Sequence, residues 1–297
     1  MTGIMIAWQN KLPALAYYWM STRSQAATWQ HNGVWLPAYR VTIDGLPIEG
    51  ITENASGLTF NPDTGTLFAV INRPPQVAEL TTEGRLLRLI PVEGIHDPEG
   101  ISHVRGERYV IADEIGEHLY WVEIGPHMTM LDATLMPRLA TENDLVGNKG
   151  FEGVSWDYTR ERLFVVKEKS PLRVNEITGI ASYFNGEGVL PRIHEWKPSN
   201  SMTQLMTDLS SLTVHEPTGN MLLLSHESHL VAEYAPDGTL VSIMPLRKGW
   251  HGLRKTVPQA EGIAMDTNGA LYILSEPNLF YRFDRTSIPR WATQTSR

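Results

Sequence analysis

Short apolar segments recur along the chain, and the same polar and turn-forming residues precede each of them. A copy begins with a small polar or acidic residue, then Gly or Ser, then an aliphatic residue, and continues through a turn into an apolar strand. The five copies begin at Ser56, Glu99, Glu152, Ser210 and Glu261. Their spacing, roughly 40 to 60 residues, is typical of one four-stranded blade of a β-propeller.

The apolar strands do not alternate between apolar and polar residues. Leu67–Ile71 and Leu271–Leu274 are apolar at every position, so both faces of these strands must be buried. A propeller blade meets this condition because each of its faces packs on a neighbouring blade. Turn-forming sequences such as Asn61–Gly65 and Asp266–Gly269 precede the strands and predict hairpins.

The last copy ends near Phe283 without a fourth strand, and Ala38–Ile43 can supply one. Such a strand would close the ring and remove an open sheet edge. We therefore predict an all-β fold, a β-propeller of five four-stranded blades closed by an N-terminal strand, with residues 37–297 as its single domain. Six blades are the alternative, if Ile180–Asp208 contains a degenerate blade.

The N-terminal residues 1–36 lie before the first predicted strand. Ile4–Trp19 is rather apolar, but polar residues and Pro13 interrupt it, so it lacks the roughly 20 continuous apolar residues of a membrane helix. It also lacks the positive start and clean apolar run of a signal peptide. We expect a poorly ordered leader; the alternative is the remnant of a membrane anchor or a surface-lying amphipathic segment.

The polar positions of the repeat are expected to meet at one end of the channel, here called the funnel. If the first strand of each blade lines the channel and the second returns, then first-strand starts and second-strand ends share this end. Seven of these ten positions are glutamates, namely Glu99, Glu114, Glu152, Glu168, Glu227, Glu261 and Glu276.

Carboxylates that converge in this way repel one another, and a cation would offset the repulsion. Calcium takes about six to eight oxygen ligands, whereas zinc prefers His and Cys. We therefore predict that these seven glutamates bind Ca²⁺. The alternative is that each glutamate accepts amide hydrogen bonds from the adjacent blade and locks the ring.

Basic residues are expected beside the funnel, although the chain is acidic, with 33 Asp and Glu against 25 Lys and Arg. The candidates for ligand binding are Lys149, Lys167, Arg247, Lys248 and His226. They suit phosphate or carboxylate ligands, or they pair with the glutamates. We expect a small anionic ligand or a protein partner at the funnel, and membrane contact, if there is any, only through the N-terminal segment.

The net charge of −8 argues against a nucleic-acid partner, because such affinity comes largely from Lys and Arg. The chain contains no cysteine, which excludes a disulfide, a thiolate nucleophile and a Cys zinc site. The strong catalytic motifs, such as G-x-S-x-G, H-E-x-x-H and a glycine-rich phosphate loop, are absent from the sequence.

Several segments carry a family likeness: Pro258–Asp266, Leu271–Phe283, Ala55–Phe60 and Lys149–Gly153. Through them the chain resembles the YjiK family, also called SdiA-regulated proteins, over about residues 38–284. The resemblance implies a bacterial β-propeller that is exported or anchored at the inner membrane, a likeness to calcium-dependent phytases, and a relative, CarP, tied to calcium handling. Because this chain departs from the family pattern in lacking a convincing anchor, a cytoplasmic location is the alternative to the periplasm or inner membrane.

Two functions follow from these observations. The first is a calcium-binding propeller that recognises a ligand or partner at the acidic funnel. The alternative is a calcium-dependent, phytase-like hydrolase of phosphoesters, in which a metal-bound water attacks the ester. We rank binding first because calcium ligands are plentiful, whereas no residue stands out as a catalytic base.

Overall fold

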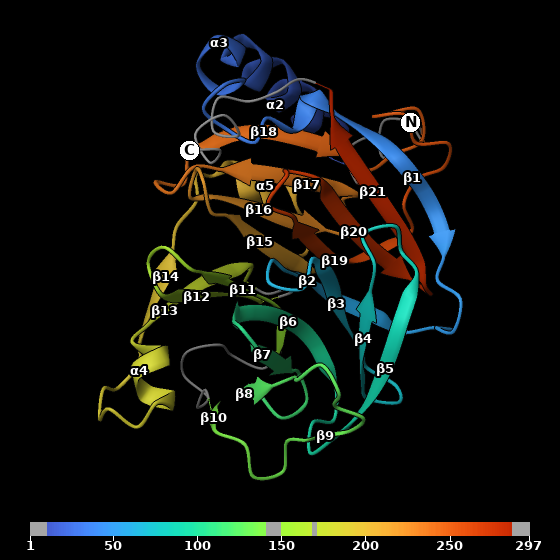
Figure 1. Cartoon of the computed structure of the whole chain (residues 1–297). Coiled ribbons are helices and arrows are strands. Elements are labelled where there is room, and N and C mark those ends of the chain that lie inside the picture. Colours follow the sequence, from blue (N-terminus) through green and yellow to red (C-terminus); the bar gives the residue numbers. More distant parts are fainter. Residues whose placement is uncertain (1–10, 141–149, 168–170, 287–297) are drawn as a thin grey trace, which may run out of the picture.

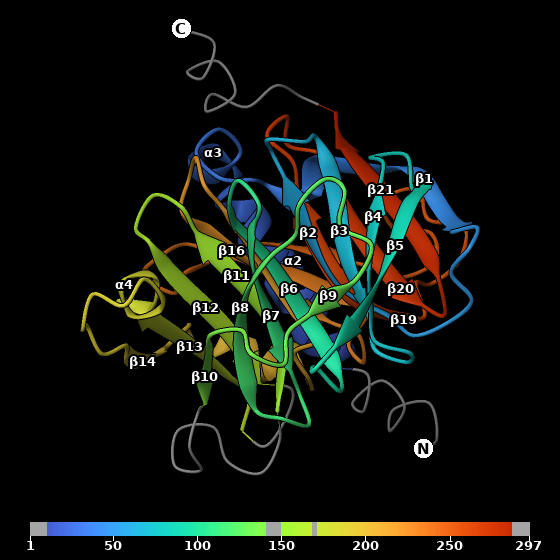
Figure 2. The ribbon, with the colours of Figure 1, turned by 60° about the horizontal axis from the view of Figure 1, so that its bottom comes forward.

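Five β-sheets surround a central axis as the blades of a propeller (Figure 1). The computed structural model describes residues 11–140, 150–167 and 171–286. The first strand of each sheet contacts the first strands of both neighbouring sheets, so that these five strands form a closed inner ring. The sheets follow one another around the axis in chain order, as the colours in Figure 2 show. The predicted all-β propeller of five blades is confirmed.

Each blade has four antiparallel strands that follow one another in the chain, apart from the last blade, which takes its fourth strand from the N-terminal part, and the second, in which β9 intervenes between the third and fourth strands. The first strands are β2 (Ala55–Asn61), β6 (Pro98–Arg105), β11 (Phe151–Asp157), β15 (Ser211–His215) and β19 (Gln259–Met265). The second strands are β3 (Thr66–Ile71), β7 (Arg108–Asp113), β12 (Arg162–Lys167), β16 (Asn220–Ser225) and β20 (Leu271–Glu276). The third strands are β4 (Gln76–Leu80), β8 (His118–Glu123), β13 (Arg173–Thr178), β17 (Leu230–Tyr234) and β21 (Leu279–Arg285).

The fourth strands complete the sheets, and one of them comes from the N-terminal part of the chain. They are β5 (Leu86–Glu93), β10 (Arg138–Ala140), β14 (Arg192–Trp196), β18 (Leu240–Pro245) and β1 (Tyr39–Pro47). Strand β1 pairs antiparallel with β21, with Val41 opposite Phe283, and so closes the ring as predicted. The short strand β9 (Leu131–Asp132) adds a parallel fifth strand to the first blade.

The predicted alternative of a sixth blade is not realised. Residues 180–208 contain the fourth strand of the third blade, β14, flanked by the short helices α4 (Ile180–Phe184) and α5 (Ser201–Leu205). One strand and two helical turns cannot form a further sheet, so the described chain has five blades.

Apolar side chains from adjacent blades form a separate core at each blade interface. Five such clusters are present, and each draws on the inner strands of two neighbouring sheets. Leu222 of β16 and Ile263 of β19, for example, lie in the cluster between the fourth and fifth blades. This packing explains why the strands are apolar at successive positions, as the sequence indicated.

The inner strands are also joined by hydroxyl groups that cross from blade to blade. A backbone N–H of one inner strand donates to a Ser or Thr hydroxyl of the preceding one. These bonds run from His103 to Thr59 at 3.1 Å, from Trp156 to Ser102 at 2.8 Å and from Val214 to Ser155 at 3.0 Å. Because inner strands have no further strand beside them, these hydroxyls satisfy backbone donors that would otherwise lie unpaired in the interior.

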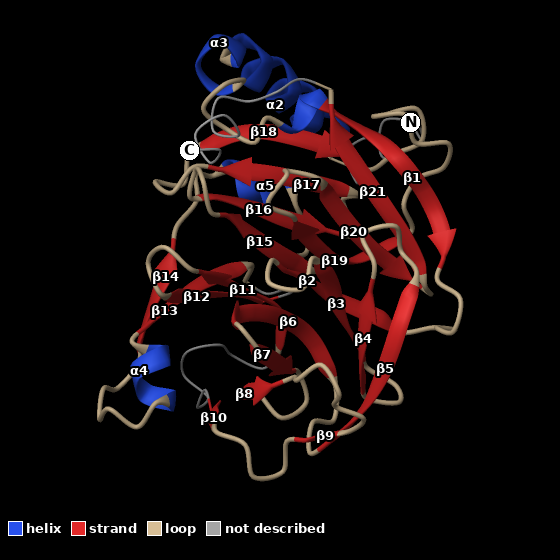
Figure 3. Ribbon diagram, viewed as in Figure 1, coloured by secondary structure: helices blue, strands red, loops and turns tan. Residues whose placement is uncertain are grey.

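The segment expected to be a poorly ordered leader differs from that expectation from residue 11 onward. It forms α2 (Leu12–Ser24), α3 (Ala26–Trp29) and the 3-10 turn η1 (Leu36–Ala38), which lie outside the sheets (Figure 3). Pro13 is the second residue of α2 and does not interrupt it, because the N–H groups in the first turn of a helix have no partner within the helix. Leu15, Tyr18 and Trp19 then pack on the core between the third and fourth blades. Among the described residues, no helix is both long and apolar enough to span a bilayer.

Candidate functional site

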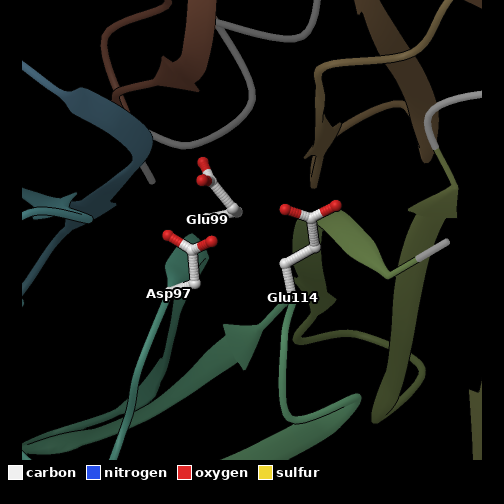
Figure 4. A group of neighbouring side chains, drawn as sticks. All are labelled: Asp97, Glu99 and Glu114. Carbon is white, nitrogen blue, oxygen red and sulfur yellow. The ribbon is translucent and has the colours of Figure 1, made fainter.

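Three carboxylates meet at the funnel, on the second blade. Asp97 directly precedes β6, Glu99 is the second residue of that strand, and Glu114 directly follows β7. One oxygen from each side chain lies within 4.8 Å of the other two (Figure 4). In the part of the chain that the structure describes, this is the one group of three or more His, Asp or Glu side chains spaced to hold a metal ion.

The backbone around these residues is fixed by bonds between the ends of β6 and β7. The Asp97 N–H donates to Asp113 Oδ1 at 2.9 Å, and the Glu114 N–H donates to the Asp97 carbonyl, also at 2.9 Å. Asp113 is fully buried. These bonds hold the loop ends in place and bring the side chains of Asp97 and Glu114 beside each other.

Glu99 is positioned by the preceding blade. Its Oε2 accepts a hydrogen bond from Ser56 Oγ and its Oε1 accepts one from Asn72 Nδ2, both at 2.6 Å. Ser56 and Asn72 occupy the repeat positions that hold glutamates in other blades. These bonds are of the kind that the ring-locking alternative describes, although a carboxylate retains lone pairs for a cation as well.

Burial raises the pKa of Glu99 to about 7, and the charges of Asp97 and Glu114 act in the same direction, against the hydrogen bonds from Ser56 and Asn72. The carboxyl is therefore close to half protonated at neutral pH when no cation is present. A divalent cation at this position would favour the ionised form.

Asp97 is buried, yet only one of its oxygens has a polar neighbour. Its Oδ2 lies 3.5 Å from Nη2 of Arg73, an exposed side chain, whereas Oδ1 has no hydrogen-bond partner among the described residues. A buried acceptor without a partner costs about 1 to 3 kcal/mol. Together with the crowding of three carboxylates, this unpaired oxygen fits a bound cation.

The predicted glutamates are only partly brought together. Glu99 and Glu114 belong to the group of three, whereas Glu152, Glu227, Glu261 and Glu276 lie outside it. Glu168 falls outside the described residues. The seven glutamates belong to four of the five blades, because the first blade has Ser56 and Asn72 at these positions. Among the described glutamates, only Glu99 and Glu114, on one blade, approach closely enough to share a small cation.

A second acidic arrangement lies between the fourth and fifth blades, around His226. The Nδ1 atom of His226 lies 3.1 Å from Asp208 Oδ2 and 3.3 Å from Glu261 Oε1, without the alignment of a hydrogen bond. Asp208 is fully buried and accepts hydrogen bonds from the backbone N–H groups of His226 and Glu227. His226 is thus held between two carboxylates.

The other predicted ligand-binding residues differ in their surroundings. Lys167 is buried at the end of β12. Arg247 donates from Nη2 to the Ser228 carbonyl at 3.2 Å, and burial lowers the pKa of its guanidinium. Lys248 is exposed, and Lys149 lies outside the described residues.

Asp97 and Arg73 are the two residues at the site that the repeat did not predict. Asp97 stands two residues before the start of its copy, and Asp208 stands two residues before Ser210. A comparison of the positions just before each copy could have identified both aspartates. Arg73 follows Asn72 in the loop after β3, and no feature of the repeat distinguishes it.

Solved structures share the fold at low sequence identity. A luciferin-regenerating enzyme matches with a TM-score of 0.54 and 11% identity, over 84% of this chain and 97% of that one. Streptogramin B lyase matches with a TM-score of 0.49 and 9% identity, over 84% and 98%. A chain of a nidogen–laminin complex matches with a TM-score of 0.47 and 13% identity, over 75% and 73%. At these identities the first of these likenesses supports the fold alone.

The family comparison is more specific because it covers most of the chain. The sequence model of the SdiA-regulated family matches residues 31–284, a range that contains all five blades and the closing strand β1. This match agrees with the resemblance carried by the repeat motifs, and the chain therefore belongs to the SdiA-regulated family.

Proposed function

We propose that this protein binds calcium through Asp97, Glu99 and Glu114 and recognises an anionic ligand or partner at the same end of the channel. The observation that carries the proposal is the approach of three carboxylates to within 4.8 Å, with the buried Asp97 Oδ1 unpaired. A cation there would offset the repulsion among the carboxylates and give the unpaired oxygen a partner.

The donor atoms favour calcium over zinc. All three candidate ligands are carboxylate oxygens, whereas a zinc site usually includes His or Cys. Calcium takes about six to eight oxygens, so three carboxylates leave several coordination positions for water or for an oxygen of a ligand. An anionic group can therefore bind the ion directly.

Charge around the site supports an anionic ligand once the ion is bound. Arg73 lies beside Asp97 and keeps most of its side chain exposed, so its guanidinium is accessible to a phosphate or carboxylate. Arg247 and Lys248 lie in the loop that leads into β19, at the same end of the propeller. A divalent ion and these basic groups together provide positive charge that is complementary to an anionic ligand.

Calcium-dependent hydrolysis of phosphoesters is the second candidate function. The observation that favours it is His226, whose Nδ1 lies 3.1 Å from Asp208 Oδ2 and 3.3 Å from Glu261 Oε1, two carboxylates that would stabilise the protonated ring of a general acid–base. Turnover of p-nitrophenyl phosphate or phytate that stops with EDTA, returns with calcium and falls in His226→Gln would place hydrolysis first.

Calorimetric titration of calcium into EDTA-treated protein tests the binding proposal. We expect saturable binding that is lost in a double variant with Glu99→Gln and Glu114→Gln, because two of the three ligands then carry no charge. The matched control is Glu276→Gln, which removes a funnel glutamate outside the group. Equal loss in the control, or no binding in the unmodified protein, would contradict the proposal.

A further inference from the structure

A cavity of about 500 Å³ lies at the end of the channel opposite the three carboxylates. All five blades contribute to it through the last residues of their inner strands and the turns that follow. Pockets for small molecules usually have about 300 to 1,000 Å³, so the volume is sufficient for one. None of the residues that line this cavity belongs to the group of three carboxylates.

The wall of the cavity combines aromatic side chains with carboxylates. The aromatic residues that line it are Phe60, Trp156 and Tyr158, and the acidic ones are Glu216 and Asp266. Of the described residues that line the cavity, none is Lys or Arg. The formal charge of the wall is therefore negative.

The two histidines in the wall do not offset this charge. His103 and His215 are both buried, and burial lowers the pKa of each, that of His215 to about 3. His103 Nε2 also lies 2.8 Å from the Gly106 carbonyl, to which it donates, so that the other ring nitrogen of the neutral form is an acceptor. Burial thus favours the neutral form of both histidines.

The two carboxylates accept hydrogen bonds from uncharged N–H and hydroxyl groups of the protein. Glu216 accepts the Tyr158 N–H at 2.7 Å and the Thr159 hydroxyl at 2.8 Å. Asp266 accepts the Tyr272 hydroxyl and the Ala270 N–H, both at 2.8 Å. Within the described chain, no ion pair involves either carboxylate, so their charge remains available to a ligand.

We propose that this cavity binds an organic cation, a small molecule with an ammonium group attached to an apolar body. Aromatic faces attract ammonium groups through cation–π interactions, most strongly where water is excluded. Glu216 and Asp266 add charge complementarity, and the apolar parts of the wall accommodate the rest of the molecule. An anionic ligand would meet two carboxylates and no opposing cation.

Titration with three probes that share one ring tests the proposal: benzyltrimethylammonium, benzyl alcohol and benzenesulfonate. Ligand-detected NMR gives the affinity of each probe for the full chain. We expect the cation to bind, the alcohol to bind at least about tenfold more weakly, and the sulfonate not to bind. Equal binding of the alcohol or the sulfonate, or no binding of the cation in the millimolar range, would overturn the proposal.

Two variants locate the site. Glu216→Gln should lower the affinity for benzyltrimethylammonium about tenfold and leave the affinity for benzyl alcohol unchanged, because only the charge interaction is reduced. Phe60→Leu keeps every backbone hydrogen bond and should also lower the affinity for benzyltrimethylammonium. Glu187→Gln, a change at an exposed glutamate that does not line the cavity, should leave the affinity for both probes unchanged. If neither cavity variant alters binding of the cation while both remain folded by circular dichroism, the proposed site is wrong.

The test is independent of calcium. The double variant at Glu99 and Glu114 should retain its affinity for benzyltrimethylammonium, since those residues lie at the other end of the channel. A loss of calcium binding together with unchanged probe binding would show that the two proposals succeed or fail separately.

Discussion

Calcium binding should release a proton from Glu99. The pKa of this carboxyl is about 7 in the folded protein without a cation, against an ordinary value of 4.5, because the side chain is buried beside Asp97 and Glu114. A cation among the three carboxylates requires the ionised form, so binding and deprotonation are coupled.

The size of the effect follows from this pKa. At pH 7 about half of a proton should leave for each calcium bound, and at pH 6 about nine-tenths. The apparent affinity should therefore be about tenfold weaker at pH 6 than at pH 8. The same raised pKa means that the folded state holds a proton between pH 4.5 and 7 that the unfolded state has lost. Without calcium, the contribution of Glu99 to stability thus falls as the pH rises through this window.

Calorimetry in two buffers with different ionisation enthalpies, such as PIPES and imidazole, measures the released proton. We expect the observed heats to differ between the buffers at pH 6.5 and to converge at pH 8. The Glu276→Gln variant should release the same fraction of a proton as the unmodified protein. Identical heats in both buffers at pH 6.5, with an affinity that does not change with pH, would refute the role of Glu99.

Further predictions concern stability. Glu233 is fully buried and accepts four hydrogen bonds, two of them from the backbone N–H groups of Val34 and Trp35. Glu233→Gln should lower the free energy of unfolding by about 2 to 4 kcal/mol in urea titration, with the exposed Glu187→Gln unchanged. An added Cβ at Gly57 would lie 2.6 Å from a backbone oxygen of the next blade, so alanine there should cost about 1 to 3 kcal/mol, measured in the same way. Calcium at a hundredfold excess over its Kd should add about 2.7 kcal/mol, seen as a higher melting temperature that EDTA reverses. An unchanged free energy of unfolding in either variant would contradict the role given to that residue. An unchanged melting temperature with calcium would contradict calcium binding to the folded state.

The blades could be predicted from the sequence because the physical requirement is local and repeated. A strand buried on both faces must be apolar at every position, and the repeat marks where each such strand begins. Strand β1 was predictable for a different reason, since an incomplete last blade needs a partner for β21. Both inferences depend on patterns within short segments of chain.

The membership of the carboxylate group could not be predicted from the same pattern. The repeat places acidic residues at one end of the channel, but it does not determine which side chains approach one another across a ring of five blades. Glu99 turns toward Ser56 and Asn72 of the preceding blade, and Asp97 lies outside the repeat. These are contacts between segments far apart in the sequence.

The cavity at the opposite end escaped prediction because its wall is mainly apolar and hydroxyl-bearing. The sequence does contain a signal, since Thr59, Ser102, Ser155 and Thr213 stand at the same position in four copies of the repeat. The first three of these hydroxyls bridge neighbouring inner strands, and all four residues line the cavity. The sequence alone does not show that these Ser and Thr residues lie where the inner strands meet a cavity.

Anomalous diffraction from crystals grown with calcium would locate the ion that we propose among Asp97, Glu99 and Glu114. We expect an anomalous peak bounded by these three side chains, with oxygens about 2.3 to 2.6 Å from the ion. A peak at another group of residues, or carboxylates that only hydrogen-bond to Ser56 and Asn72 with no peak between them, would contradict the proposal.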